Sequence, residues 1–186
     1  MARPSKKAVA YWQRAASMSW KDLAGLWRQI KDNSTSDWDD GKAFEHLVVR
    51  AFELSRLKVE YPFDVPPGGR PIEQIDGVVF LGSIAFLIEC KDRQSNDVEA
   101  IAKLRNQLLR RPPSTMGCVL VSGEFTDAAL ILTDWAIPHR ITLWTGNDIA
   151  SGLEARDFAS KLSEKYEHLC KFGMSDHSPN FKAQQV

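Results

Sequence analysis

Two carboxylates and an ammonium group are spaced so that a β-hairpin would bring them together. Residues 72–91 form two apolar runs on either side of Gly82-Ser83, a dipeptide that favours a two-residue hairpin turn. In that register Asp76 lies opposite Glu89, and opposed Cβ atoms of an antiparallel pair are about 4.5–5.5 Å apart. Lys91 points to the same face as Glu89, because side chains alternate along a strand.

Two carboxylates this close require a compensating cation. Like charges opposite one another destabilise a sheet, and neither carboxylate ionises readily beside the other without a positive charge nearby. Mg²⁺ suits a few carboxylate oxygens, a carbonyl and waters, and substrate phosphates complete its shell. A charged lysine is not a metal ligand, but Lys91 could hold an attacking water or stabilise negative charge on phosphorus. The alternative is a chance salt bridge at a sheet edge.

The order Asp76, then Glu89-Cys90-Lys91, resembles the signature of the restriction-endonuclease-like PD-(D/E)XK nuclease superfamily, an acidic residue and a short spacer before Asp/Glu-X-Lys. Ile75 stands where the superfamily often has proline. The resemblance implies that Asp76 and Glu89 bind Mg²⁺ together with the main-chain carbonyl of Cys90, and that Mn²⁺ can substitute. It also implies that Lys91 assists the nucleophilic water.

A helix upstream could bring a third carboxylate to this site. After the capping and turn residues Asp39-Asp40-Gly41, apolar residues recur with the period of an amphipathic helix at Phe44, Leu47, Val48, Ala51 and Phe52. Glu45 lies on the edge of that stripe. The segment resembles the first core helix of Mrr-type, modification-dependent restriction enzymes, in which a glutamate often leans toward the metal. Glu45 is therefore a further candidate ligand and catalytic residue, or else a solvated residue beside the stripe.

A second predicted helix, residues 96–111, follows the candidate lysine. Its apolar side is expected to carry Val98, Ile101, Ala102, Leu104, Leu108 and Leu109. Lys103, Gln107 and Arg110 fall on the other side, where a phosphate backbone could lie, and some members of the superfamily carry a functional glutamine on this helix. The alternative is a solvated face that keeps the helix soluble.

The expected order of elements is helix, three strands, helix, strand, helix, strand. The first strand would be 57–63, and later strands would be 117–122 and 140–144. This order favours an α/β fold, a restriction-endonuclease-like α/β/α sandwich with a mixed central sheet. At 186 residues one full core is natural. We expect a nuclease domain over residues 37–172, a helical, basic and Trp-rich extension over 1–36, and a flexible tail over 173–186.

The N-terminal extension has a charge of its own, although the whole chain carries 24 basic and 24 acidic residues. Seven basic residues stand against Asp22 in the first 31 positions: Arg3, Lys6, Lys7, Arg14, Lys21, Arg28 and Lys31. A basic segment with aromatic residues could touch nucleic acid. The helical spacing of Trp20, Leu23, Leu26, Trp27 and Ile30 favours packing against the core or a partner. We therefore expect a homodimer or a partner protein bound through this segment.

Several classes of protein are disfavoured by composition. Cys90, Cys118 and Cys170 form no paired framework, which argues against structural zinc and for a reducing, cytoplasmic location. The four histidines show no ligand spacing. A secretory or membrane-spanning apolar run is also missing from the sequence, so no membrane association is expected.

The leading interpretation is a Mg²⁺-dependent DNA endonuclease, with a role in restriction or phage defence by analogy. A Holliday-junction or repair nuclease would use the same residues. A non-catalytic subunit that binds DNA or a partner is the alternative from another class, and the presence of Asp76, Glu89 and Lys91 speaks against it.

Overall fold

The computed structural model describes residues 6–61, 63–65, 73–135 and 140–176. The helices in these ranges are α1 (Lys6–Ala16), α2 (Trp20–Lys31), α3 (Lys42–Leu54), α4 (Glu99–Leu108), α5 (Asp127–Trp135), α6 (Gly146–Ala155) and α7 (Phe158–Phe172). The strands are β1 (Lys58–Glu60), β2 (Phe63–Val65), β3 (Glu73–Ile75), β4 (Gly77–Leu81), β5 (Ile84–Lys91), β6 (Ser95–Asn96), β7 (Met116–Val121), β8 (Glu124–Phe125) and β9 (Ile141–Trp144).

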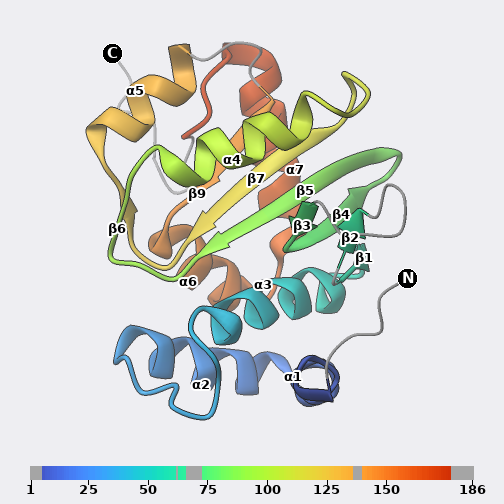
Figure 1. Ribbon diagram of the computed structural model, residues 1–186, viewed down its shortest axis with the longest axis vertical. Helices are drawn as coiled ribbons and strands as arrows, with labels where there is room; N and C mark the ends of the chain where they lie inside the picture. Colours follow the sequence, from blue (N-terminus) through green and yellow to red (C-terminus); the bar gives the residue numbers. More distant parts are fainter. Residues whose placement is uncertain (1–5, 62, 66–72, 136–139, 177–186) are drawn as a thin grey trace.

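A five-stranded mixed sheet forms the centre, in the order β1-β4-β5-β7-β9. β1, β4 and β5 are antiparallel neighbours, whereas β5, β7 and β9 run parallel. Helices cover both faces, with α4 on one side and α3 on the other (Figure 1). The predicted α/β sandwich with a mixed central sheet is confirmed.

Alternating residues of β5 supply the two halves of the core. Phe86 and Ile88 pack with α2, α3, α6 and α7, whereas Leu87 packs with α4 and with residues of β7 and β9. Glu89 and Lys91 share the parity of Leu87, so they belong to the α4 face. The period of the strand thus decides which helix can reach the candidate site.

The hairpin register predicted from Gly82-Ser83 is confirmed. Leu81 pairs with Ile84, and Gly77 pairs with Ile88 at the other end of the ladder. Gly82 adopts a positive φ of 58°, the left-handed region that glycine enters without a steric penalty. Asp76 sits one residue beyond the last pair, in the bend between β3 and β4.

The helix predicted after Asp39-Asp40-Gly41 is α3, and its apolar stripe is buried. Its N-cap is Gly41 rather than either aspartate, with a φ of 75°. The predicted strand 57–63 is divided into β1 and β2, and residue 62 lies outside the described part. The predicted strands 117–122 and 140–144 correspond to β7 and β9.

Two features of the predicted helix 96–111 are wrong. The helix begins only at Glu99, because Ser95 and Asn96 pair with β8 instead. Gln107 is buried at 3% exposure, whereas Leu109 is 62% exposed. The buried residues of the helix are Ala100, Ile101, Leu104, Gln107 and Leu108, so the core-facing side is rotated from the predicted one and includes the glutamine.

The N-terminal helices pack on the core. Leu23, Leu26 and Ile30 of α2 are buried in the same cluster as α3, and the half-buried Trp20 and Trp27 contact Phe158 and Phe44. The spacing of these residues therefore reflects packing. At the other end, α7 ends before Gly173, whose φ is 68°. Most of the predicted tail, residues 177–186, lies outside the described residues. No described helix has the length and hydropathy needed to traverse a bilayer.

Candidate active site

The first carboxylate is tied directly to the strand that carries the second. Asp76 is 8% exposed and Glu89 is fully buried. The Cys90 main-chain N–H donates a 2.8 Å hydrogen bond to Asp76 Oδ2. This contact holds the bend after β3 against the carboxyl end of β5, so Asp76 lies beside the residue that follows Glu89.

Glu89 lies between two lysines. Lys91 Nζ is 2.9 Å from Glu89 Oε1, and Lys103 Nζ, which comes from α4, is 2.6 Å from Glu89 Oε2. The contact of Lys91 is an ion pair whose geometry falls outside that of a hydrogen bond, so Oε1 is a buried oxygen without a hydrogen-bond donor among the described residues. A buried oxygen of this kind is costly without a cation beside it, and the Lys91 ammonium is the cation that faces it here.

Glu45 joins the site from the first turn of α3. It forms an ion pair with Lys42, one turn earlier, and accepts a 3.4 Å hydrogen bond from the Tyr61 hydroxyl. The Tyr61 oxygen also lies 3.2 Å from His46 Nε2. Burial, followed by the charge of Lys42, lowers the pKa of His46 to about 4. A neutral His46 with its proton on Nε2 can donate to Tyr61 while Tyr61 donates to Glu45.

The charge of Glu45 acts on Asp76. Burial, followed by the charge of Glu45, raises the pKa of Asp76, while the Cys90 N–H and two lysines act in the opposite direction. Burial and then the charges of Asp76, Glu45 and Glu89 raise the pKa of the Cys90 thiol. Glu45, whose side chain is 12% exposed, is therefore not a solvated flank residue.

Lys91 is held in its charged form. Burial opposes its charge, but the contact with Glu89 and the charges of Glu89 and Asp76 outweigh burial and raise the pKa of Lys91. Its side chain is 29% exposed. An ammonium that is permanently charged and still reaches solvent can stabilise an anion but cannot serve as a base at neutral pH.

The donor set fits a hard divalent cation. Carboxylate oxygens of Asp76 and Glu89 and the Cys90 carbonyl are the oxygen ligands that Mg²⁺ prefers, and the buried Glu89 Oε1 lacks a hydrogen-bond donor among the described residues. In the arrangement seen here, the described residues contain no cluster of three or more His, Cys, Asp and Glu side chains set to hold a metal. The lysines hold Glu89 and Glu45 instead.

The three residues predicted to contact nucleic acid from α4 lie in three different environments in the structure. Lys103 belongs to the site through Glu89, whereas Gln107 is buried in the core and Arg110 is exposed just beyond the helix. Lys42 and Tyr61 were missed by the sequence analysis. The spacing of Lys42 and Glu45 was a usable signal, because i,i+3 residues are neighbours on a helix. Nothing in the sequence pointed to Tyr61.

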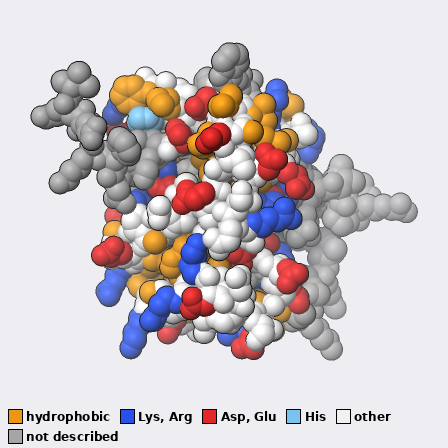
Figure 2. Space-filling model, turned by 90° about the vertical axis from the view of Figure 1, so that its left-hand side faces the viewer, with side chains coloured by type: hydrophobic (Ala, Val, Ile, Leu, Met, Phe, Trp, Pro, Cys, Tyr) orange, Lys and Arg blue, Asp and Glu red, His pale blue; other side chains and the backbone are white. Residues whose placement is uncertain are grey.

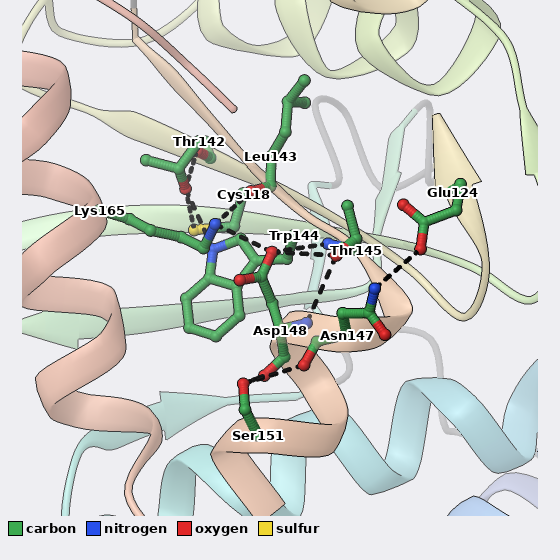
Figure 3. A network of polar contacts seen from close by, with 11 residues as sticks. Cys118, Glu124, Thr142, Leu143, Trp144, Thr145, Asn147, Asp148, Ser151 and Lys165 are labelled. Atoms are coloured by element: carbon green, nitrogen blue, oxygen red, sulfur yellow. Dashed lines mark hydrogen bonds and ion pairs between the residues drawn. The ribbon is translucent and has the colours of Figure 1, made fainter. Parts of the chain in front are cut away.

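A second polar network lies on the α7 side of the sheet (Figure 3). Fully buried Lys165 forms a 3.0 Å ion pair with Asp148 and donates a 2.8 Å hydrogen bond to the Leu143 carbonyl. Asp148 also closes a capping box with Thr145 at the start of α6. Lys165 and Asp148 neutralise each other, and Asp148 also caps the start of α6. The network therefore joins α6, α7 and β9 rather than forming a reaction site.

One face of the surface is mixed in charge. In the view of Figure 2, acidic and basic side chains are interspersed. A face of this kind differs from the broad basic surface that would favour a junction nuclease.

Comparisons with known proteins were made at three levels. Two solved structures are similar: the DNA modification-dependent restriction endonuclease AspBHI, at 16% identity and a TM-score of 0.44, and the MspJI restriction endonuclease in complex with a 27-mer oligonucleotide, at 15% identity and a TM-score of 0.40. The matches cover 92% and 85% of this chain but only 44% and 39% of those chains. The chain thus spans less than half the length of either structure. No curated protein matches it.

The family comparison covers most of the region that carries the site. The Mrr_cat restriction endonuclease model matches residues 38–153, a range that begins before α3 and includes Glu45, Asp76, Glu89 and Lys91. The match extends over more than half of the sequence. The resemblance read from the Asp76 and Glu89-Cys90-Lys91 motif is thereby confirmed, and the chain belongs to the Mrr-type restriction endonuclease family.

Proposed function

We propose that this chain is a Mg²⁺-dependent endonuclease that hydrolyses phosphodiester bonds of DNA. The observation that carries the proposal is the meeting of Asp76, Glu89 and Lys91 at the carboxyl end of β5. Membership of the restriction endonuclease family supports nuclease chemistry. A buried carboxylate beside a partly exposed, charged lysine is an arrangement that holds a cation and stabilises an anion at the same place.

The carboxylates would hold the metal. Asp76 and Glu89, with the Cys90 carbonyl, would bind Mg²⁺ or Mn²⁺, and Glu45 would be a further ligand on the α3 side. When bound, the ion supplies a Lewis acid for the phosphate and a more acidic water. The hydrogen bond from the Cys90 N–H orients Asp76, since it fixes one of the two carboxylate oxygens. The Tyr61 hydroxyl does the same for Glu45.

Lys91 would act on the phosphate. Its raised pKa keeps it cationic, so it would orient the attacking water through a hydrogen bond and stabilise charge on the phosphoryl oxygens. The ion pair with Glu89 aims the ammonium at the metal-binding carboxylate. Lys91 is therefore an electrostatic group in this mechanism and takes no proton.

The family supports a proposal for the biological setting. We place the activity in restriction or phage defence, because the family is one of restriction endonucleases. A Holliday-junction or repair nuclease remains the alternative within the enzyme class. A non-catalytic binding subunit is the alternative outside it, and one observation favours it: both oxygens of Glu89 already face lysines.

The organisation of the whole protein is part of the proposal. Residues 37–172 would be the nuclease domain, and residues 1–36 an extension through which a second copy or a partner binds. Because the apolar residues of α2 pack on the core, we propose α1, whose Trp12 is 47% exposed, as the place of such a contact. Two copies would supply one site for each strand of a duplex. A cytoplasmic location stays a prediction from cysteine usage.

A cleavage assay tests the function. Plasmid, linear, branched and modified DNA are incubated with the full chain, with Mg²⁺ and with EDTA, beside Lys91→Ala and the exposed control Arg105→Ala on α4. We expect cleavage with Mg²⁺ only, a loss of about 10²–10³-fold for Lys91→Ala, and no change for Arg105→Ala. Cleavage by Lys91→Ala at the wild-type rate, or in EDTA, contradicts the mechanism. Binding of DNA without cleavage of any substrate would favour the non-catalytic subunit.

A further inference from the structure

Glu89 contacts a second lysine in addition to the lysine of the Glu-X-Lys motif. Lys91 faces Oε1 at 2.9 Å, and Lys103 faces Oε2 at 2.6 Å. The second lysine comes from α4, fourteen residues further along the chain. Glu89 is fully buried, whereas the Lys103 side chain is 42% exposed. The carboxylate cannot turn to water, but the Lys103 ammonium can.

The Lys103 ammonium lies at Glu89, where a metal ion would also bind. An ammonium 2.6 Å from Oε2 takes up one of the lone-pair sites with which the carboxylate could bind a metal ion. Its charge would also repel a divalent ion held by the same carboxylate. Metal binding at Glu89 is therefore opposed while the Lys103 ammonium stays at Oε2, and the partly exposed side chain allows the ammonium to leave without being buried elsewhere.

We propose that Lys103 is a placeholder cation that competes with the metal for Glu89 and, once displaced, binds a phosphate of DNA. The inference rests on the function proposed above. In this proposal Lys103 is a positioning residue that couples binding of the metal to binding of DNA. A DNA phosphate gives the displaced ammonium a new anion, and DNA therefore favours binding of the metal. By linkage, the metal then favours DNA to the same extent.

Loss of Lys103 should change the affinity for the metal and the affinity for DNA in opposite directions. Without DNA, Lys103→Met removes the competitor, so Mn²⁺ should bind more tightly by about tenfold, the change that ~1.4 kcal/mol produces. With a divalent ion present, the same substitution removes a phosphate contact, so DNA should bind more weakly. A simple DNA contact would leave the metal affinity unchanged, and a purely structural role would not change the two affinities in opposite directions.

The experiment measures metal binding without turnover. Mn²⁺ is titrated calorimetrically into the full wild-type chain, Lys103→Met, Lys103→Arg and the control Arg105→Met, which is exposed on the same helix. Binding of a labelled short duplex is followed by anisotropy in EDTA and in Ca²⁺. We expect tighter Mn²⁺ binding for Lys103→Met alone and wild-type affinity for Lys103→Arg, which keeps the charge. The loss of duplex affinity should occur in Ca²⁺ and not in EDTA.

Two results would overturn the inference, and they differ from each other. Unchanged or weaker Mn²⁺ binding by folded Lys103→Met, in a wild type that binds Mn²⁺ and cleaves DNA, refutes the placeholder and leaves the nuclease function intact. A wild type that binds no metal refutes the proposed function and the placeholder with it. If Lys103→Met fails to fold, Lys103→Gln takes its place, with the same expected direction for both ligands.

Discussion

Replacing Asp76 by asparagine should stabilise the metal-free protein. The ionised carboxylate is disfavoured first by burial and then by the charge of Glu45, and the hydrogen bond from the Cys90 N–H only partly offsets these effects, since the pKa of Asp76 is raised overall. Asparagine is nearly isosteric, and its carbonyl oxygen can still accept from the Cys90 N–H at the 2.8 Å contact. We expect a gain of about 1 kcal/mol in the free energy of unfolding, typical of relieving a strained functional site.

The gain should depend on pH with a definite sign. The folded-state pKa of Asp76 lies above its unfolded value, so between these two values the folded protein binds the extra proton. This group therefore destabilises the wild type increasingly as the pH rises through that window. The advantage of Asp76→Asn should be small below the unfolded pKa, near 3.8, and fully developed above the folded pKa.

Mg²⁺ should reverse the order of stability. A ligand present at a hundred times its Kd stabilises the folded state by about 2.7 kcal/mol, and only the wild type would bind it well. Urea denaturation of both proteins in EDTA and in Mg²⁺, at acidic and at neutral pH, measures the difference. A less stable Asp76→Asn protein in EDTA at neutral pH would refute the reasoning, because it would mean that the charged hydrogen bond to Cys90 outweighs burial and Glu45.

Three further outcomes are expected. Lys91→Ala should keep DNA affinity, measured by anisotropy, while losing cleavage, and a parallel loss of both would make Lys91 a binding residue instead. Glu45→Ala should reduce cleavage less than Asp76→Ala does, with a shift in the Mg²⁺ concentration needed, and an unchanged metal dependence would remove Glu45 from the ligands. Trp20→Ala with Trp27→Ala should lower the free energy of unfolding by about 2 kcal/mol or more, since two half-buried aromatic residues are removed, without changing the mass found by light scattering. A lower mass would place the partner contact on α2 instead of α1.

Local signals were sufficient for the hairpin and its acids. A Gly82-Ser83 turn between two apolar runs has one favoured register, and the period of two then assigns each side chain to a face. Asp76, Glu89 and Lys91 were therefore predicted to converge, and the structure brings them together. Glu45 was a candidate because the helix that carries it resembles the first core helix of Mrr-type restriction enzymes, in which a glutamate often leans toward the metal.

The orientation of α4 was harder to predict from the sequence. Its apolar residues are spread widely enough that two rotations of the helix bury similar numbers of them. The choice is made by β5 and β7, against which Leu104 and Leu108 pack, and the rotation that fits them also buries Gln107. Which polar residue lies on the buried side is thus decided by the shape of the sheet.

The sequence by itself determined the motif, the hairpin register and the family, because these depend on neighbouring residues and their period. Only the tertiary structure decided which charges surround the motif. Lys103 meets Glu89 because α4 crosses the face of β5 to which Glu89 points, and Tyr61 meets Glu45 through the packing of the chain beside α3. Such contacts depend on how helices are placed on a sheet, and no spacing along the chain encodes that placement directly.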